Sequence, residues 1–434
     1  MKYEQAMEYL EEMNQRGSVM GLESIRELCK RLGNPQDGLS FVHIAGTNGK
    51  GSVLAYVSTV LTAAGYKTGR YLSPVIRDYR ERIQVNGRMI TKKAVGEILS
   101  QIRDVAEEMR EEGLAQPTVF EMETAMAFLY FKQTGCRVVV LETGLGGALD
   151  ATNLVQNTLV AVFASISMDH MAVLGKTLSA IAGQKAGIIK GGCSVVTASQ
   201  QPEVLAILKE TAAQKGCKFT VADKTSATRI RYGIHKQQFD YAGYKNLEIS
   251  LAGKCQITNC ITAIEVIRAL EEKGFPVSEK ALRTGLRDTR WDGRFTVIQK
   301  QPLFIIDGAH NEDAAKKLAD SLRFYFTNRR IIYIMGVLRD KEYEKILAET
   351  YALADQIITL TPPGNPRALS AYELAVAAKE YHPNVTAADS VEEAVEVAEL
   401  LAGREDVIVA FGSLSYLGKL MDVMEKKKGV KHGR

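Results

Sequence analysis

A glycine-rich segment with one lysine and two hydroxyl side chains occupies residues 46–52. It reads Gly-Thr-Asn-Gly-Lys-Gly-Ser, follows the apolar run 41–45 and precedes a helix that we expect over residues 53–64. Glycines allow successive backbone N–H groups to point at phosphate oxygens, and the start of the following helix attracts negative charge. Lys50 can neutralise β- and γ-phosphates, and Ser52 can approach a metal ion. The segment is therefore a candidate nucleotide-phosphate loop.

The spacing of this loop departs from the standard string GxxxxGK[ST]. Ile44 stands at the first glycine position, and Gly51 separates the lysine from the serine. The alternative interpretation is a glycine-rich turn with an incidental lysine. Three glycines, a lysine and a hydroxyl at the junction of an expected strand and helix favour the phosphate loop.

Two further polar side chains stand where expected strands end. Glu142 closes the run 137–142, and His170 follows the strand expected over 159–166. Ligands of open α/β sheets gather at the carboxyl edge, where a carboxylate suits Mg²⁺ held between protein and nucleotide phosphates. For Glu142 the alternative is a solvated carboxylate. His170 can be a metal ligand, a base or a structural histidine, and its strand-end position favours the metal ligand.

A lysine and a polar turn in the rest of the chain are further candidates. Lys185 lies on an expected helix among small residues, where a surface lysine is the default interpretation. A buried lysine with a lowered pKa can instead react with CO₂ to form a carbamate, which is a metal-binding anion. Asp307 and His310 lie in a turn between an expected strand and helix, and Ser413 follows the last expected strand. Such turns can present polar groups to a ligand between domains.

The elements that position these residues alternate along the chain. Apolar runs separated by helical patterns predict a mainly parallel α/β sheet, preceded by two amphipathic helices within residues 2–32. A hairpin is expected over residues 82–90, around an Asn-Gly pair. The pattern restarts after residue 294, with strands expected over 303–307, 331–336, 356–360 and 406–411. We therefore predict two α/β domains, residues 1–295 and 296–434.

Composition narrows the class of protein. The chain has 434 residues, 46% of them hydrophobic and 24% charged, and a formal net charge of +4, which is typical of a globular protein. This small charge permits an anionic small substrate and does not call for nucleic acid. The six cysteines form no CxxC pair, so neither a zinc site nor a disulfide framework is indicated. Because no signal peptide or membrane-length apolar stretch is recognisable, we expect a cytoplasmic protein without a membrane partner.

Taken in order, these motifs resemble the Mur ligase superfamily and, within it, the folylpolyglutamate synthase/dihydrofolate synthase family. The resemblance spans nearly the whole chain and implies an N-terminal phosphate-loop ATPase-like central domain with a smaller Rossmann-like C-terminal domain. Its markers are Gly21-Leu22, the segment 32–36, the segment 43–52, Ser73-Pro74, the segment 81–83, the segment 144–153, Asp169-His170, the segment 185–189, Gly293-Arg294, the segment 307–311 and the segment 412–414.

The resemblance implies a ligation in three steps. ATP phosphorylates the terminal carboxylate of a pterin substrate, the amino group of L-glutamate attacks the acyl phosphate, and the tetrahedral intermediate expels phosphate. The implied activities are tetrahydrofolylpolyglutamate synthase and, in addition, dihydrofolate synthase acting on dihydropteroate. Two Mg²⁺ ions are implied as cofactors, K⁺ is a further cation that the resemblance allows, and a monomer is the expected state.

The resemblance also implies roles for matched positions, which fall into five overlapping sets. Residues expected to hold ATP are Asn48, Gly49, Lys50, Gly51, Ser52, Asn259, Arg294 and Asp307. Residues expected to bind metal are Ser73, Glu142, His170 and Lys185, the last as a carbamate. Residues expected to form the folate or pteroate pocket are Met20, Gly21, Leu22, Thr118, Val119, Phe120, Glu121, Leu149, Asp150 and Ala151. Residues expected near the incoming glutamate are His310 and Ser413; Lys50, Lys185, His170 and His310 form the expected catalytic group.

The chain departs from the family pattern at three places. Val75-Ile76 replaces a usual His-Leu after Ser73-Pro74, Ala148 replaces a usual arginine, and Asp292 replaces a frequent proline. The loss of a cation at position 148 bears on pterin specificity and on chain-length preference. A cell-wall-precursor ligase is the nearest alternative, and the segment 150–153 together with Gly21-Leu22 favours folate over it. A phosphate-loop ATPase switch is the alternative from another class, and it would leave Lys185 and the 307–311 turn without a role.

Overall fold

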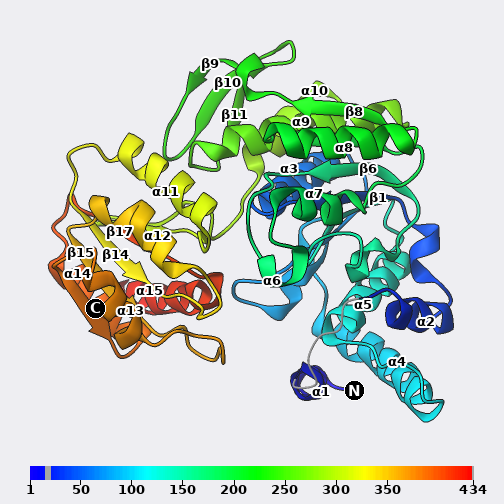
Figure 1. The fold of residues 1–434 in the computed structure, drawn as a ribbon, viewed down its shortest axis with the longest axis horizontal. Coiled ribbons are helices and arrows are strands. Elements are labelled where there is room, and N and C mark those ends of the chain that lie inside the picture. The colour runs from blue at the N-terminus through cyan, green and yellow to red at the C-terminus, as the bar shows by residue number, and fades with distance from the viewer. Residues whose placement is uncertain (15–20, 433–434) are drawn as a thin grey trace.

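The computed structural model describes residues 1–14 and 21–432, and Figure 1 shows two α/β parts side by side. The N-terminal part is built on an eight-stranded sheet of order β4-β3-β2-β5-β1-β6-β7-β8. Its strands are β1 (Phe41–Ala45), β2 (Thr68–Tyr71), β3 (Ile83–Val85), β4 (Arg88–Met89), β5 (Val138–Glu142), β6 (Thr158–Phe163), β7 (Ser194–Ala198) and β8 (Lys218–Ala222). Neighbouring strands from β2 to β8 in this order are parallel, whereas β3 and β4 add an antiparallel edge.

Helices cover both faces of this sheet because successive strand residues point to opposite sides. Val138 and Val140 of β5 pack with one helical layer, whereas Val139 and Leu141 pack with the other. The first layer contains α3 (Lys50–Ala63), α9 (Cys255–Glu272) and α10 (Glu279–Asp288). The second contains α1 (Tyr3–Asn14), α2 (Glu23–Arg31), α4 (Lys92–Glu111) and α5 (Val119–Thr134), and α7 (Leu178–Ala186) and α8 (Pro202–Gln214) extend it over β6 and β7. The short helix α6 (Met171–Leu174) precedes α7.

A small antiparallel sheet, which the sequence patterns did not predict, lies beside the helices α9 and α10 of the first layer in Figure 1. It consists of β9 (Thr228–Arg231), β10 (Gln237–Tyr241) and β11 (Tyr244–Ile249) in the order β11-β10-β9. Phe239 and Leu247 are fully buried in the same apolar cluster as α9 and α10. The small sheet therefore closes the end of that core.

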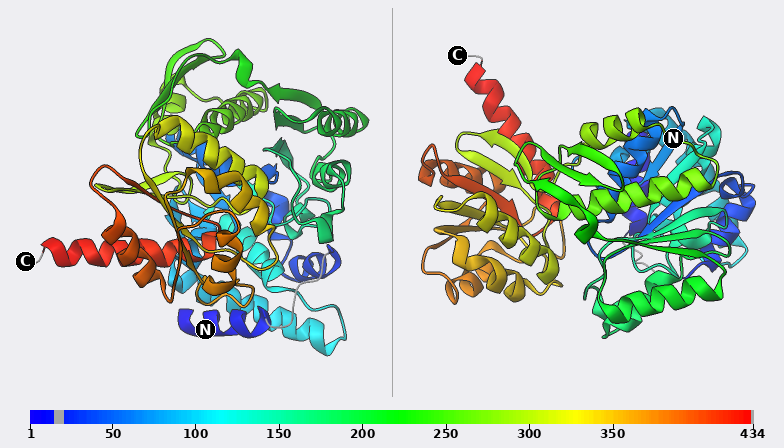
Figure 2. Two further views of the ribbon diagram at one scale, coloured as in Figure 1. Left: turned by 60° about the vertical axis from the view of Figure 1, so that its left-hand side comes forward. Right: turned by 90° about the horizontal axis from the view of Figure 1, so that it is seen from above.

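The C-terminal part is a six-stranded sheet of order β12-β13-β17-β14-β15-β16. Its strands are β12 (Thr296–Lys300), β13 (Leu303–Ile306), β14 (Ile331–Met335), β15 (Gln356–Leu360), β16 (Val385–Ala388) and β17 (Val407–Phe411). Only the β12–β13 pair is antiparallel. Its helices are α11 (Glu312–Tyr325), α12 (Tyr343–Thr350), α13 (Ala371–Lys379), α14 (Val391–Leu401) and α15 (Leu417–His432), and Figure 2 shows α15 reaching away from the body of the molecule.

The predicted α/β class, the strands expected over 41–45, 137–142, 159–166, 303–307, 331–336, 356–360 and 406–411, and the 82–90 hairpin are confirmed, whereas β2, β12 and β16 were not predicted. In the hairpin Asn86 and Gly87 both adopt positive φ, which a tight turn between twisted strands requires. The helix after the glycine-rich segment begins at Lys50 rather than at residue 53, because the end of the loop is itself the first helical turn. Among the helices of the described ranges, none combines the length and apolar composition needed to span a bilayer.

Candidate active site

The glycine-rich loop connects the carboxyl end of β1 to the start of α3. The N–H groups of Thr47 and Asn48 donate to the Ser165 carbonyl at 2.7 and 3.1 Å, which ties the loop to the end of β6. Gly46 and Gly49 have φ of +154° and +91°, and a side chain at either position would meet Ala164 or Asn259 closer than 3.0 Å. Only glycine therefore fits the backbone of the loop at these two positions. With no side chain there, the N–H groups at the start of α3 stay open to an anion.

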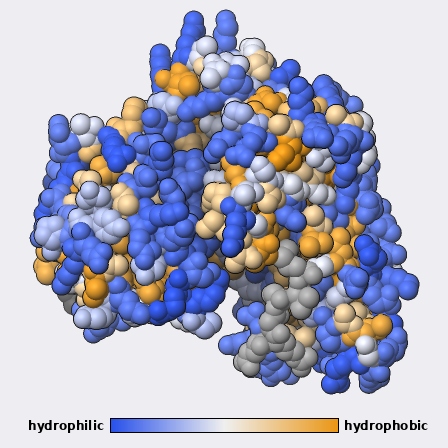
Figure 3. Space-filling model, in the orientation of Figure 1, coloured by the Kyte–Doolittle hydropathy of each residue, from blue (hydrophilic) through white to orange (hydrophobic). Residues whose placement is uncertain are grey.

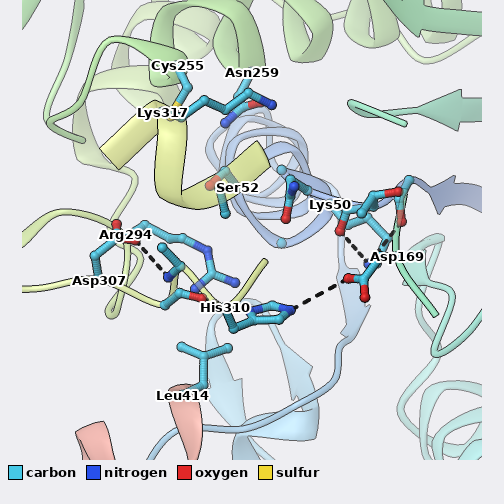
Figure 4. Close-up of a pocket in the computed structure, with 18 of the residues that line it drawn as sticks. Lys50, Ser52, Asp169, Cys255, Asn259, Arg294, Asp307, His310, Lys317 and Leu414 are labelled. Carbon is cyan, nitrogen blue, oxygen red and sulfur yellow. Dashed lines mark hydrogen bonds and ion pairs between the residues drawn. The ribbon is translucent and has the colours of Figure 1, made fainter. Parts of the chain in front are cut away.

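Lys50, the first residue of α3, folds back over this loop. Its Nζ lies 3.1 Å from the Gly46 carbonyl oxygen, 3.4 Å from the Thr47 carbonyl oxygen and 3.9 Å from the Glu142 carboxylate. Figure 4 shows Lys50 and Ser52 at the start of the helix, facing the space toward the C-terminal part. The lysine thus brings a cation to the position where the loop would receive phosphates.

Glu142 ends β5 and is buried beside Lys50. Burial raises the pKa of this carboxyl to about 7, although Lys50 and Arg294 act in the opposite direction. A buried carboxylate whose cation lies 3.9 Å away still has oxygen lone pairs for another positive group. Glu142 is therefore suited to a bound cation, as its strand-end position predicted.

Lys185 is buried on α7, with 4% of its surface exposed, so the default interpretation of a surface lysine is wrong. Its Nζ donates to the Gly46 carbonyl at 3.0 Å. Burial, followed by the nearby Lys50, lowers the pKa of Lys185 to about 7. A substantial neutral fraction of this amine therefore exists near neutral pH, which carbamate formation requires.

The four predicted metal ligands line one cavity of about 190 Å³ with the phosphate loop. They are Ser73, Glu142, His170 and Lys185. In the described parts of the chain, no three His, Cys, Asp or Glu residues cluster as a metal site. The donor set therefore fits an ion only if the serine hydroxyl, a modified Lys185 or ligand oxygens complete it.

The residues predicted to hold ATP line the same cavity. They are Asn48, Gly49, Lys50, Gly51, Ser52, Asn259, Arg294 and Asp307. Asp307 accepts the N–H groups of Phe295 and Ala309, both at 2.8 Å, and is thereby fixed beside Arg294 at the start of the C-terminal part. The side chains of Arg294 and Asp307 face the same space as Ser52 from the opposite side (Figure 4). The cavity therefore lies between the two parts of the molecule.

A polar cluster around Asp169 joins the two parts, and the sequence patterns gave most of its members no role. Lys341 Nζ and Asn311 Nδ2 each lie 2.9 Å from an Asp169 oxygen, and His310 Nε2 lies 3.9 Å away (Figure 4). Asn311 also exchanges hydrogen bonds with Asn48 of the phosphate loop, at 3.1 and 3.2 Å. Lys341 follows the strand β14, so its position after a strand end was the signal that could have found it.

A second cavity of about 540 Å³ adjoins the first, and the space-filling view shows a hollow between the two parts with hydrophilic residues on the C-terminal side (Figure 3). Predicted folate, glutamate and metal residues on its wall are Gly21, Ser73, Thr118, Phe120, Glu121, Leu149, Asp150, Ala151, His170, His310 and Ser413. Leu22 and Val119 do not line it, because they pack against the apolar cluster under the second helical layer. Met20 lies outside the described residues. The structure thus brings together most of the predicted folate set.

Two of the sequence departures are placed by this geometry. Val75 lines the second cavity, whereas Ala148 packs against Gly187, where an added Cβ would approach the alanine Cβ to 2.5 Å. The Ala148 N–H donates to the Gln184 carbonyl at 2.8 Å, next to Lys185 on α7. The loop after β5 and the helix that carries Lys185 are therefore packed together closely at this point.

Comparison with known proteins places these features in a family. Residues 44–267 match the family model of the Mur ligase middle domain, and residues 293–414 match that of the Mur ligase, glutamate ligase domain. The Bacillus subtilis dihydrofolate synthase/folylpolyglutamate synthase is 33% identical over 425 residues, covering 96% of this chain and 98% of the relative. The Escherichia coli protein of the same name is 31% identical, covering 97% and 95%.

Solved structures of the same family resemble this chain over nearly its whole length. The folylpolyglutamate synthase of Thermotoga maritima superposes with a TM-score of 0.84 at 33% identity, covering 98% of this chain and 96% of that one. Escherichia coli FolC in complex with DHPP and ADP superposes with a TM-score of 0.87 at 31% identity, covering 99% of both chains. A phosphate loop between two α/β parts, a buried lysine beside it and these matches over almost the full length lead to one conclusion: the chain belongs to the dihydrofolate synthase/folylpolyglutamate synthase family of Mur ligases, which are ATP-dependent ligases.

Proposed function

We propose that this protein joins L-glutamate to the terminal carboxylate of a folate-type substrate through an acyl phosphate made from ATP. One observation carries the proposal: the cavity on the phosphate loop and the second cavity share the wall formed by Ser73, Gly144, His170 and His310. A phosphate at the loop and a carboxylate from the second cavity can therefore meet. Their meeting place lies between the two parts, where closure would exclude water.

In this proposal the phosphate loop and Lys50 hold the triphosphate of ATP. Asn259 faces the nucleotide from α9, and Arg294 and Asp307 face it from the C-terminal part. Phosphoryl transfer depends mainly on position and charge neutralisation, so the residues contribute by aligning the γ-phosphate with the carboxylate.

We propose that Ser73, Glu142, His170 and a carbamate on Lys185 hold two Mg²⁺ ions, with K⁺ as a further candidate cation. Bound Mg²⁺ supplies charge neutralisation at the phosphate oxygens. The buried carboxylate of Glu142 and the amine of Lys185 support this assignment, because burial disfavours the charged form of each side chain. A bound cation would neutralise Glu142, and the neutral amine of Lys185 is the form that reacts with CO₂. A carbamate would turn the like-charged pair of Lys50 and Lys185 into an ion pair.

The second cavity is the proposed place of the folate or pteroate, with its ring end against Phe120, Leu149 and Ala151. The incoming glutamate would lie by His310 and Ser413. His310 Nδ1 lies 2.8 Å from the Gly308 carbonyl, so Nδ1 carries the proton, and Nε2, 3.9 Å from the Asp169 carboxylate, can accept a proton from the attacking amine. Burial, followed by Lys341, lowers the pKa of His310 to about 4, which keeps this nitrogen unprotonated at neutral pH.

We also propose that the chain divides after residue 295, because β12 at Thr296 is the first strand of the second large sheet. With the family resemblance as support, we further propose a cytoplasmic monomer whose substrates are small molecules and which needs neither nucleic acid nor a membrane.

A substrate panel tests the function. Dihydropteroate and tetrahydrofolate are each incubated with ATP, Mg²⁺ and radiolabelled glutamate, and phosphate release and labelled product are measured. We expect phosphate release to require both glutamate and at least one of the two pterins, with product formed in equal amount. ATP hydrolysis that neither substrate changes would refute the ligase and favour an ATPase switch.

A further inference from the structure

A chain of three polar side chains runs from the sheet core to the wall of the second cavity. His43 Nε2 on β1 lies 2.8 Å from Thr152 Oγ1, and Thr152 Oγ1 lies 2.5 Å from Asp150 Oδ1. His43 and Thr152 have no exposed surface, and only Asp150 lines the cavity. The two buried members therefore touch the site only through the third.

The direction of these hydrogen bonds follows from the inventory of donors. Burial raises the pKa of Asp150, but its two oxygens accept the N–H groups of Leu145 and Thr152, which favours the ionised form. An ionised carboxylate only accepts, so the Thr152 hydroxyl donates to Asp150 and must accept from His43. His43 Nε2 therefore carries a proton, whereas Nδ1 is buried with no acceptor among the described residues and carries none. Burial, together with the charge of Lys190, lowers the pKa of His43 to about 3, which agrees with a neutral ring.

Packing alone does not account for a histidine at this position. Within the described residues, Nδ1 of His43 is buried without a hydrogen-bond partner, and an unpartnered buried polar atom costs free energy. An apolar side chain of similar volume would avoid that cost, as Phe41 does on the same face of β1. The feature that distinguishes His43 from such a side chain is the proton it donates to Thr152.

Asp150 transmits this arrangement to the cavity wall. Its carboxylate also accepts the N–H of Leu145 at 2.7 Å and the N–H of Thr152 at 3.1 Å. These bonds close the loop 144–152, which carries Leu149 and Ala151 on the wall where we propose that the folate lies. A Thr152 hydroxyl that rotated away would leave Asp150 one donor short and this loop less defined.

We propose that His43 is a positioning residue for folate recognition: its Nε2–H orients the Thr152 hydroxyl toward Asp150 and thereby fixes the wall of the second cavity. This inference rests on the proposed function, because it takes the second cavity as the folate site. The phosphate loop begins three residues after His43, so the same strand supports both substrates. The effect of a His43 substitution on the folate KM and on the ATP KM must therefore be measured separately.

Two matched pairs of variants test the role. His43→Gln keeps a side-chain N–H donor and His43→Leu removes it, whereas Thr152→Ser keeps the hydroxyl and Thr152→Val removes it. The kcat, the KM for tetrahydrofolate or dihydropteroate, the KM for ATP and the melting temperature are measured for each. We expect the two variants that break the chain to raise the folate KM by about tenfold, the size of one lost hydrogen bond. The KM for ATP should change by less than about twofold, and the conservative partners should lie near wild type.

The double variant His43→Leu/Thr152→Val measures whether the chain acts as a unit. We expect its folate KM to equal that of Thr152→Val alone, because His43 acts only through the hydroxyl. Effects that multiply, a KM for ATP that rises with the folate KM, or a change in melting temperature alone would overturn the inference. A wild-type enzyme without folate-dependent turnover would instead remove the proposed function, and with it this role.

A spectroscopic measurement is independent of activity. In protein labelled with ¹⁵N-histidine, the signal that disappears in His43→Gln belongs to His43, one of six histidines in the chain. We expect this signal to show the Nε2–H tautomer. The Nδ1–H tautomer would place the donor on the wrong side of the ring and overturn the inference.

Discussion

Lys185 Nζ and Lys50 Nζ contact the same carbonyl oxygen, that of Gly46, at 3.0 and 3.1 Å. Two cations that meet at one acceptor repel each other, and Lys185 is also buried, so its neutral form is favoured. A carbamate on Lys185 would replace this repulsion by attraction to Lys50. The relationship therefore connects the phosphate loop with the proposed second metal.

The first prediction concerns Lys50. Lys50→Ala removes the cation over the phosphate loop, and we expect kcat to fall by at least roughly 10²–10³-fold, as for the loss of a charge-stabilising donor. The rate of phosphate release in the presence of folate and glutamate measures this kcat. Lys93→Ala, which changes an exposed lysine on α4, is the control and should be fully active. Near-normal turnover in Lys50→Ala would contradict the assigned loop.

The second prediction concerns the carbamate. Lys185→Ala should be inactive and should regain part of its activity with a small carboxylic acid, which can take the place of the carbamate. Lys185→Arg is the matched control for lost side-chain volume, because arginine fills the space of the lysine but forms no carbamate. ¹³C NMR in ¹³C-bicarbonate should show a carbamate signal in the wild type that Lys185→Ala lacks. A fully active Lys185→Ala would refute the role.

The third prediction is the effect of pH on stability through the unmodified Lys185. Its folded-state pKa of about 7 lies below the unfolded value of about 10.4. Between these values the unfolded chain binds more protons, so this group makes the free energy of unfolding rise with pH from about 7 to about 10. Below pH 7 its full destabilising effect is present. Urea unfolding of CO₂-free protein measures the slope, which should be smaller in Lys185→Met; equal slopes would show that the amine is not buried.

The fourth prediction concerns the pair of Asp169 and Lys341, which joins the two parts of the molecule. Both side chains are about one-tenth exposed. Burial favours the neutral carboxyl, but Lys341 and the neighbouring histidines outweigh it and hold the pKa of Asp169 below its usual range. Asp169→Asn and Lys341→Met should each lower kcat/KM for glutamate by about 10–100-fold, since a partly buried charge loses its partner.

A double-variant experiment tests the Asp169–Lys341 contact more directly than the single variants do, because it measures whether the two losses depend on each other. If they act as one contact, the double variant should lose less than the product of the single losses. Arg339→Ala, which breaks an exposed ion pair with Glu373 in the same part, should have little effect. Independent effects of Asp169→Asn and Lys341→Met would show that their contact does not position the domains.

The fifth prediction concerns the metal. Chelation should abolish turnover, and added Mg²⁺ should restore it, because the cavity combines a buried carboxylate with the phosphate loop. Glu142→Gln should raise the Mg²⁺ concentration needed for half-maximal rate by about tenfold or more. The titration is repeated with and without K⁺. A rate that chelation leaves unchanged would contradict the proposed metal ligands.

The sequence by itself determined the local features. Apolar runs predicted most strands of both large sheets, since a buried parallel strand needs continuous apolar residues. The strands β2, β12 and β16 were missed because their short segments of mixed polarity form no such run. The glycine positions predicted the phosphate loop, because Gly46 and Gly49 occupy positions where a side chain would clash. Glu142 and His170 were found by their places at strand ends. The small sheet β9–β11 was missed because its strands are short and mostly polar, so that the few buried side chains, such as Phe239 and Leu247, give little apolar periodicity.

Only the tertiary structure decided which of these features act together. Burial of Lys185 depends on how α7 packs against the loop 144–148, and helical periodicity among small residues does not show it. Asp169 and Lys341 are 172 positions apart, and the packing of two separate sheets brings them to 2.9 Å. The link from His43 to Asp150 likewise arises where β1 passes under a distant loop. Local propensity depends on neighbours in the chain, whereas burial, charge pairing and pKa depend on neighbours in space.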